Sequence, residues 1–212
     1  MKFDAESVLH TMPLFQSLSP ERLSSLCAEG RVRMLERGET ALRAGETTRV
    51  LGVVLSGAVR LEREDAMGNR ELVGEVRRGE IFAEVFAVLP QTPLSVTAVA
   101  AERTAVLFLP VDALTAEPDT ALRLLRLVAA KNAALSEKLR HVSRRTTREK
   151  LLSFLDAERT RAGSERFTLR FDRQQLADYL AVDRSAMCRA LSRLKAEGVL
   201  DYDRKQFFFP HF

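Results

Sequence analysis

Residues 173–200 read RQQLADYLAVDRSAMCRALSRLKAEGVL, and the spacing of their apolar side chains predicts two helices joined by a three-residue turn. The small residue Ala177 stands where the helices must nearly touch if they cross steeply. The start signals agree, because Asp172 with Gln175 reads as a capping box and Asp183 as the second N-cap. The residues predicted to face inward are Leu176, Ala177, Leu180, Met187, Ala190, Leu191 and Leu194. The stretch therefore predicts a helix-turn-helix.

The outward face of the second helix is polar and suits base edges in a DNA major groove. The planar fork of arginine can reach O6 and N7 of one guanine, so Arg184 and Arg189 are the predicted base readers. An ordinary solvated helix face is the alternative, but the turn, the caps and the local charge favour DNA. The predicted DNA-binding residues are Arg184, Ser185, Cys188, Arg189 and Ser192, with Arg173, Gln174 and Arg193 beside them.

Two apolar segments follow the second helix, Val199–Tyr202 and Phe207–Phe209, and the polar pair Arg204 and Lys205 separates them. This pattern predicts a β-hairpin beside the second helix. The motif is therefore predicted to be a winged helix-turn-helix.

Positive charge gathers at the same end of the chain. Residues 143–212 hold 15 Lys and Arg against 10 Asp and Glu, whereas residues 1–142 hold 18 against 19. A basic last third favours a polyanion such as double-stranded DNA as partner. Phosphate contacts are expected from Arg144, Arg145, Arg148, Arg170, Arg173 and Arg193.

The rest of the composition indicates a cytoplasmic protein that does not enter a membrane. No apolar run approaches the ~18 residues of a membrane span, and the start MKFDAESVLH has no apolar signal core. Cys27 and Cys188 are the two cysteines, too few for a disulfide framework or a cysteine-based metal site within one chain.

From Val32 to Leu109 the chain shows short apolar segments punctuated by glycine, which predicts an all-β jelly roll. A helix is predicted before it, over Leu14–Ala28, with Ser19 as N-cap and Pro20 in its first turn. The predicted strands are Val50–Leu55, Ala58–Arg63, Glu71–Val76, Leu94–Ala100 and Ala105–Leu109.

A long helix is predicted to open at Pro118 and to end at Val142. Its apolar residues recur at alternating steps of three and four, which is a heptad seam typical of a parallel homodimer. The alternative is that this stripe packs on the chain's own β-roll. The seam residues are Leu125, Val128, Asn132, Leu135, Leu139 and Val142. The predicted domains are residues 1–117, 118–142 and 143–212.

Taken in order, these parts resemble the cyclic-AMP receptor protein and FNR (Crp/Fnr) family over nearly the whole chain. VLSGAVRL resembles the strand-glycine-strand signature of its β-roll, RRGEIFAEVFAV its cyclic-nucleotide cassette and DRQQLADYLAVDRSAMCRALSRLKAEGVL its DNA-reading motif. The resemblance implies a mixed α and β fold with an N-terminal cyclic-nucleotide-binding-type β-roll, a dimerisation helix and a C-terminal winged helix-turn-helix. It implies a bacterial transcription regulator that binds an inverted-repeat site as a homodimer, contacts RNA polymerase and responds to a small effector in the roll.

The cassette departs from the cyclic-AMP-binding members, which have Gly-Glu and then an Arg-Ser pair whose arginine holds the cyclic phosphate. This chain has Ala83-Glu84 and Leu94-Ser95, so the charge-assisted fork on the phosphate is lost and cyclic AMP is disfavoured. Glu84 then either contacts another ligand or accepts hydrogen bonds from the roll's own backbone. The predicted effector-binding residues are Phe82, Ala83, Glu84, Val85, Leu94, Ser95, Leu135 and Ser136.

The effector itself stays open at this level. An iron–sulfur switch is disfavoured because Cys27 stands alone near the N-terminus. A haem-based gas sensor would need an axial ligand such as His10, Cys27 or Met34. A regulator or repressor that needs no effector and carries a vestigial pocket is the other alternative.

An enzyme is the rival from another class, since jelly rolls also house metal-dependent catalysts. The histidines are His10, His141 and His211, none within the predicted roll, so a histidine-rich metal site cannot form there. The chain also lacks a Gly-x-Ser-x-Gly elbow and a phosphate-binding Gly-Lys-Ser loop. The sequence therefore predicts a protein that is not an enzyme.

Overall fold

The computed structural model describes residues 5–64, 67–89 and 91–210. The chain divides into two compact units, residues 1–129 and 130–212. The boundary between them falls inside the long helix α5, Pro118–Val142, whose start and end agree with the sequence prediction.

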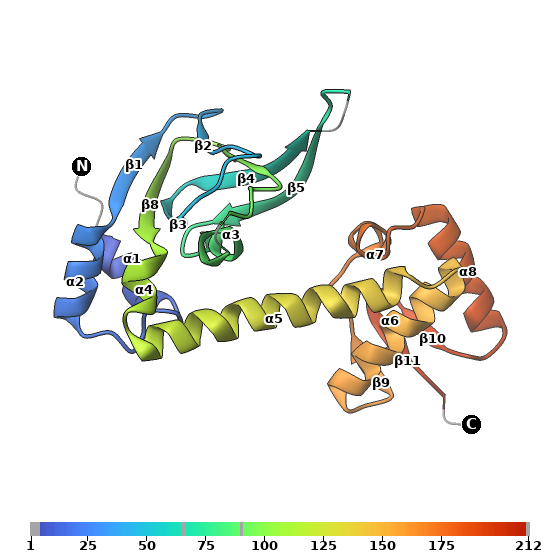
Figure 1. Ribbon diagram of the computed structural model, residues 1–212. Helices are drawn as coiled ribbons and strands as arrows, with labels where there is room; N and C mark the ends of the chain where they lie inside the picture. The colour runs from blue at the N-terminus through green and yellow to red at the C-terminus, as the bar shows by residue number, and fades with distance from the viewer. Residues whose placement is uncertain (1–4, 65–66, 90, 211–212) are drawn as a thin grey trace. The chain divides into compact units, whose positions relative to one another are not determined.

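The first unit is a β-roll of two four-stranded antiparallel sheets within the described residues (Figure 1). One sheet has the order β1-β8-β3-β6 and the other β2-β7-β4-β5. The strands are β1 Arg31–Leu35, β2 Thr40–Leu42, β3 Val50–Ser56, β4 Ala58–Glu64, β5 Arg70–Arg77, β6 Ile81–Phe82, β7 Thr97–Ala100 and β8 Thr104–Pro110. The predicted jelly roll is confirmed, although the strand expected from Leu94 begins only at Thr97.

Strands β3 and β8 are apolar at nearly every position because each has a hydrophobic core on both sides. On β3, Leu51, Val53 and Leu55 enter the core shared with the helices, whereas Val54 enters the core between the sheets. Gly52 also faces the inner core, where a Cβ atom would lie 2.2 Å from the ring of Phe82. A side chain at this glycine would therefore displace the ring of Phe82, which lies within the cassette.

Helices cover one face of the β1-β8-β3-β6 sheet through the core that they share with it. They are α1 Ala5–Thr11, α2 Pro20–Glu29, α4 Val111–Thr115 and the first turns of α5. The prediction of a helix from Leu14 was wrong, because the hydroxyl of Ser19 accepts from the backbone of Arg22 and starts α2 at Pro20. Hydrogen-bonded turns such as Leu18 N–H to Phe15 C=O take up the residues before it.

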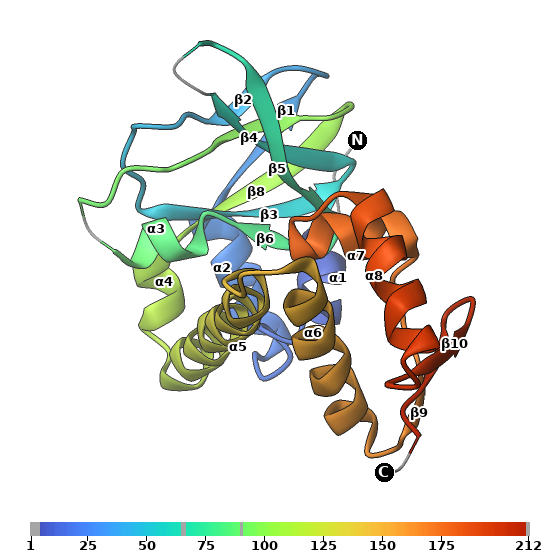
Figure 2. The ribbon, with the colours of Figure 1, turned by 90° about the vertical axis from the view of Figure 1, so that its right-hand side faces the viewer.

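The second unit contains the winged helix-turn-helix (Figure 2). After α5 its elements are α6 Thr147–Ala162, β9 Arg166–Thr168, α7 Arg173–Leu180, α8 Arg184–Ala196, β10 Asp201–Asp203 and β11 Gln206–Phe208. The predicted hairpin is confirmed as β10 and β11. Strand β9, which lies before the two helices in sequence, joins it in a sheet of order β10-β11-β9.

The capping signals read from the sequence are confirmed. Asp172 accepts from the backbone of Gln175, whose side chain accepts in return from the backbone of Asp172. Asp183 accepts from the backbone of Ala186 and starts α8. Ala181 between the helices has φ +50°, a left-handed conformation that costs a residue with a Cβ about 1–2 kcal/mol.

The apolar residues of α5 fall into two groups. Leu124 is buried in the helix-facing core of the first unit, and Leu127 and Val128 pack against that core. Leu125 is 63% exposed, and Leu135 and Leu139 are each 56% exposed. Packing on the chain's own roll therefore accounts for only part of the predicted seam.

Candidate DNA-binding surface and effector site

Helix α8 turns its apolar stripe inward and its basic edge outward. Met187, Leu191 and Leu194 are buried in a core that also contains Leu176 and Ala177 of α7. Of the predicted DNA-facing residues on α8, Arg184, Ser185, Arg189 and Ser192 are exposed and Cys188 is half-buried. The side chains proposed from the sequence therefore share one accessible edge of the helix.

A chain of hydrogen bonds runs along this edge at the start of α8. Arg189 Nη1 donates to Ser185 Oγ at 3.0 Å, and Ser185 Oγ donates to Asp183 Oδ1 at 2.6 Å. The same Asp183 oxygen accepts from the backbone N–H of Ala186 at 2.8 Å. The hydrogen bond from Ser185, followed by that from Ala186, lowers the pKa of Asp183 below its ordinary value of 3.8. The carboxylate is therefore charged at neutral pH.

A hollow of about 550 Å³ lies between the N-terminal end of α6 and the flank of α8. Thr146 caps α6 by accepting from the backbone of Glu149, and the first N–H groups of a helix attract anions. Arg148 pairs with Glu197 at 2.6 Å, while Arg189 and Arg193 line the same hollow. Three arginines line the hollow against the one carboxylate of Glu197, and this net positive charge suits a phosphate group.

The side chain of Arg173 contacts the β10–β11 hairpin, which is the wing of the winged helix-turn-helix. The sequence did not indicate this contact. Its Nη2 donates to the carbonyl of Arg204 at 2.9 Å, and its guanidinium lies over the rings of Tyr202 and Phe207 at 5.0 and 5.1 Å. These contacts tie the start of α7 to the β10–β11 hairpin. A phosphate contact by Arg173 stays a prediction, as does one by Gln174, whose amide bonds to Asp178 at 2.8 Å.

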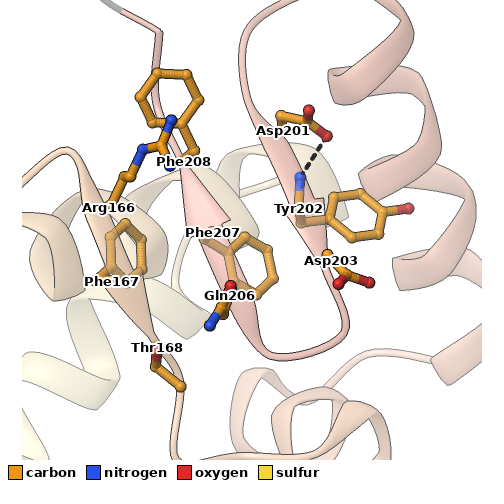
Figure 3. A pocket seen from close by; sticks show the side chains of 9 residues that line it. All are labelled: Arg166, Phe167, Thr168, Asp201, Tyr202, Asp203, Gln206, Phe207 and Phe208. Carbon is orange, nitrogen blue, oxygen red and sulfur yellow. Dashed lines mark hydrogen bonds between the residues drawn. The ribbon is translucent and has the colours of Figure 1, made fainter.

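A row of aromatic rings runs across the two strands of the wing and the adjacent strand β9 (Figure 3). Phe167, Phe207 and Tyr202 lie opposite one another in the register, and the ring of Phe207 is 6.0 Å from Phe167 and 5.7 Å from Tyr202. Beside them, Arg166 lies over the ring of Phe208 at 4.7 Å. A shallow hollow of about 470 Å³ follows this sheet. The row fixes the wing on the core that also holds α8.

The last two turns of α5 are joined to the DNA-binding elements. His141 Nδ1 is hydrogen-bonded with Ser153 Oγ of α6 at 2.8 Å, and its ring meets the edge of Phe154 at 5.7 Å. Glu137 accepts two hydrogen bonds from Arg161 of α6, at 3.0 and 2.8 Å. The end of α5 therefore belongs to the same compact unit as the helix-turn-helix.

The cassette of the β-roll lies where β6 passes into α3, Glu84–Val88. Ala83 has φ +62°, the left-handed conformation that glycine adopts without strain. Glu84 and Leu94 are each 5% exposed, and Phe82 is 2% exposed. The position of the phosphate-binding arginine in cyclic-AMP-binding members is therefore filled by a buried leucine.

Other predicted effector residues are more accessible. Val85 is half-buried and Ser95 is exposed. Leu135 and Ser136 are exposed and belong to the second compact unit, so their predicted part in the effector site is not tested.

The residues considered as axial haem ligands differ in their exposure. Cys27 packs against the core of the first unit, His10 is exposed in the last turn of α1, and Met34 is 39% exposed. Among residues 5–64, 67–89 and 91–210, no group of three or more His, Cys, Asp or Glu could hold a metal ion. His211 lies outside the described residues. Within the same ranges, no helix has the length and apolarity to cross a membrane.

Both the β-roll part and the helix-turn-helix part of the chain match known protein families. Residues 32–117 match the cyclic nucleotide-binding domain and residues 149–209 match the Crp-like helix-turn-helix domain. The cyclic AMP receptor protein of Thermus thermophilus is 31% identical over 198 residues, 89% of this chain and 88% of that protein. The "Probable transcriptional regulator flp" of Lacticaseibacillus casei is 27% identical over 205 residues, 95% of this chain and 93% of that protein.

A solved structure agrees with these matches. The Thermus thermophilus catabolite activator protein aligns with a TM-score of 0.52 and 26% identity over 93% of each chain. The fold and the site thus define a two-domain DNA-binding regulator. The chain belongs to the Crp/Fnr family of transcription regulators, whose members bind DNA and act as dimers.

Acid is expected to destabilise the second unit through His141. Burial, followed by the charge of Arg140, lowers the pKa of His141 below its ordinary value of 6.5. The unfolded chain binds a proton near pH 6.5 and the folded chain resists it, so stability is full above that pH and falls as the pH drops through it. We expect the free energy of unfolding in urea to decrease from pH 7.5 to pH 5.5.

The replacement His141→Gln should flatten that pH dependence, measured by circular dichroism on the full chain. His10→Gln is the matched control, because His10 is exposed on α1. Equal slopes for the wild type and His141→Gln would contradict the assignment.

Proposed function

We propose that this regulator is a homodimer that reads an inverted-repeat DNA site with α8 and is controlled through its β-roll by a small effector other than cyclic AMP. The observation behind the DNA-binding part of this proposal is the exposed basic edge of α8. Arg184 and Arg189 lie on it, while the opposite stripe is buried against α7. An edge of this kind at the start of a recognition helix suits guanines in the major groove.

Phosphate contacts would position the helix on the duplex. The hollow between α6 and α8 combines a capped helix N-terminus with Arg148 and Arg193. A phosphate held there would place α8 in the groove without adding sequence information. Contact with RNA polymerase is part of the proposal on the family resemblance alone.

The exposed leucines of α5 support the dimer. Leu125, Leu135 and Leu139 follow the heptad spacing and are each more than half exposed. Such a stripe is costly in water and is covered when the equivalent helix of a second copy packs along it. A two-fold dimer presents two copies of α8 to the two halves of an inverted repeat.

The cassette is the basis for excluding cyclic AMP from the proposal. Leu94 replaces the arginine that would hold the cyclic phosphate, and it is buried. A phosphate beside it would lose its hydration without gaining a charge-assisted hydrogen bond. The proposal also contains no iron–sulfur cluster, because Cys27 is the one cysteine near the N-terminus and a cluster of this kind is held by several cysteines.

A regulator without an effector is the second candidate, favoured by the packing between the sheets. The ring of Phe82 lies against Gly52 and meets the ring of Phe108 edge-on at 6.3 Å. These side chains fill part of the space between the sheets with apolar groups. A roll filled in this way can act as a structural part of the dimer without binding a ligand.

The two arginines lining the hollow on α8 are expected to differ in their effect on DNA binding. Arg189→Ala should lose about 1–3 kcal/mol of discrimination at one base pair. Arg193→Ala should weaken binding to all sequences alike and reduce the salt slope by about one. Fluorescence anisotropy on a site selected from a random duplex pool measures both. Equal effects of the two variants on specificity would contradict this division.

A charge in the heptad seam should abolish the dimer. Leu139→Arg places a cation among the exposed leucines, where two copies would face each other across the seam. We expect monomers in sedimentation velocity, with weakened binding to the inverted repeat. Ala130→Arg is the control, since Ala130 is exposed on α5 away from the seam. A Leu139→Arg variant that stays dimeric would show the seam assignment to be wrong.

We expect no heat of binding when cyclic AMP is added to the protein, and no change in the affinity of the protein for DNA. Isothermal titration calorimetry of the full chain with cyclic AMP tests the first, and anisotropy with and without the nucleotide tests the second. Micromolar binding would overturn the argument from Leu94.

A further inference from the structure

Ser185 connects a predicted base reader to the capped start of its own helix. Ser185 and Arg189 are four residues apart and therefore lie on the same side of α8. Arg189 donates to the hydroxyl oxygen of Ser185, and the hydroxyl donates to Asp183. Asp183 is itself held by the backbone of Ala186. Three hydrogen bonds thus link the guanidinium to the backbone of the first helical turn.

We propose that Ser185 is a positioning residue that orients Arg189 toward one base pair and does not read a base itself. The proposal rests on the DNA-binding function proposed above. It assigns the specificity of that base pair to a unit of three side chains, Asp183, Ser185 and Arg189.

The hydrogen-bonding capacity of the two side chains supports this assignment. A serine hydroxyl has one hydrogen to donate, and Asp183 accepts it. Ser185 therefore has no donor left for the O6 or N7 of guanine or the O4 of thymine. A guanidinium has five N–H donors, so Arg189 keeps donors for a guanine after bonding to Ser185.

Orientation before binding is the expected benefit of this arrangement. A long exposed arginine samples many rotamers, and fixing one on the DNA costs conformational entropy. The bond to Ser185 limits these rotamers in the free protein, so less entropy is lost when the guanine is bound. The charged carboxylate of Asp183 polarises the hydroxyl toward itself and leaves its oxygen free to accept from Arg189.

Thr160 of α6 offers a comparison outside the predicted DNA-binding residues. It is also exposed, but its hydroxyl donates to the backbone carbonyl of Asp156 at 2.9 Å. Thr160→Ala thus removes an exposed helix hydroxyl without touching the bonds of Arg189.

The test measures where specificity is lost. The full-length wild type first selects its site from a random pool of duplex DNA. Anisotropy then gives the affinity of each variant for that site and for every single base-pair substitution in one half-site. The variants are Ser185→Ala, Ser185→Thr, Arg189→Ala, the double Ser185→Ala/Arg189→Ala and Thr160→Ala.

We expect Ser185→Ala to lose about tenfold in discrimination, the effect of one hydrogen bond, at the same base pair that Arg189→Ala affects. Ser185→Thr keeps the hydroxyl and should restore it. The double variant should discriminate no worse than Arg189→Ala alone, and Thr160→Ala should leave the discrimination at that base pair unchanged. Circular dichroism melting verifies that each variant is folded.

Two results would overturn the inference. Loss of discrimination by Ser185→Ala at a different base pair would show that Ser185 reads a base. No loss, with Arg189→Ala still affecting one base pair, would show that the bond to Ser185 has no part in recognition. If Arg189→Ala itself affected no base pair, the proposed base-reading function would fail instead, which the same data distinguish.

Discussion

The packing of α8 against α7 is the constraint on which the DNA-binding surface depends. Met187, Leu191 and Leu194 are almost fully buried, and burial of each such side chain contributes about 1.5–3 kcal/mol. Ala177 is completely buried at the crossing and has no side chain beyond Cβ to hold the helices apart. Because the helix has one apolar stripe, burying it leaves Arg184 with its neighbours in solvent.

The C-terminal end of α5, the proposed dimer helix, is joined to the same compact unit. Hydrogen bonds from Arg161 to Glu137 and between His141 and Ser153 join α6 to α5. The ring of Phe154 in α6 lies 5.3 Å from the ring of Tyr179 in α7. A displacement of the end of α5 would therefore carry the helix-turn-helix with it, because the two belong to one compact unit.

Much of the fold could be predicted because its signals are local. The caps at Asp172 and Asp183, the helical period of α7 and α8 and the apolar runs of β3 and β8 each depend on neighbours in sequence. Strand β9 was missed because three residues beginning at Arg166 carry no period, and they become a strand only by pairing with β11. The early start predicted for α2 came from apolar residues that the turns before Ser19 bury equally well.

The candidate site shows the same division. The sequence alone determined that Arg184, Ser185 and Arg189 share the polar edge of a capped helix, because a helix repeats every 3.6 residues and its apolar stripe must be buried. Only the tertiary structure decided that Arg173 holds the wing, through the carbonyl of Arg204, 31 residues further along the chain. A contact of this kind depends on which distant strands pack beside the helix, and no local pattern of residues contains that information.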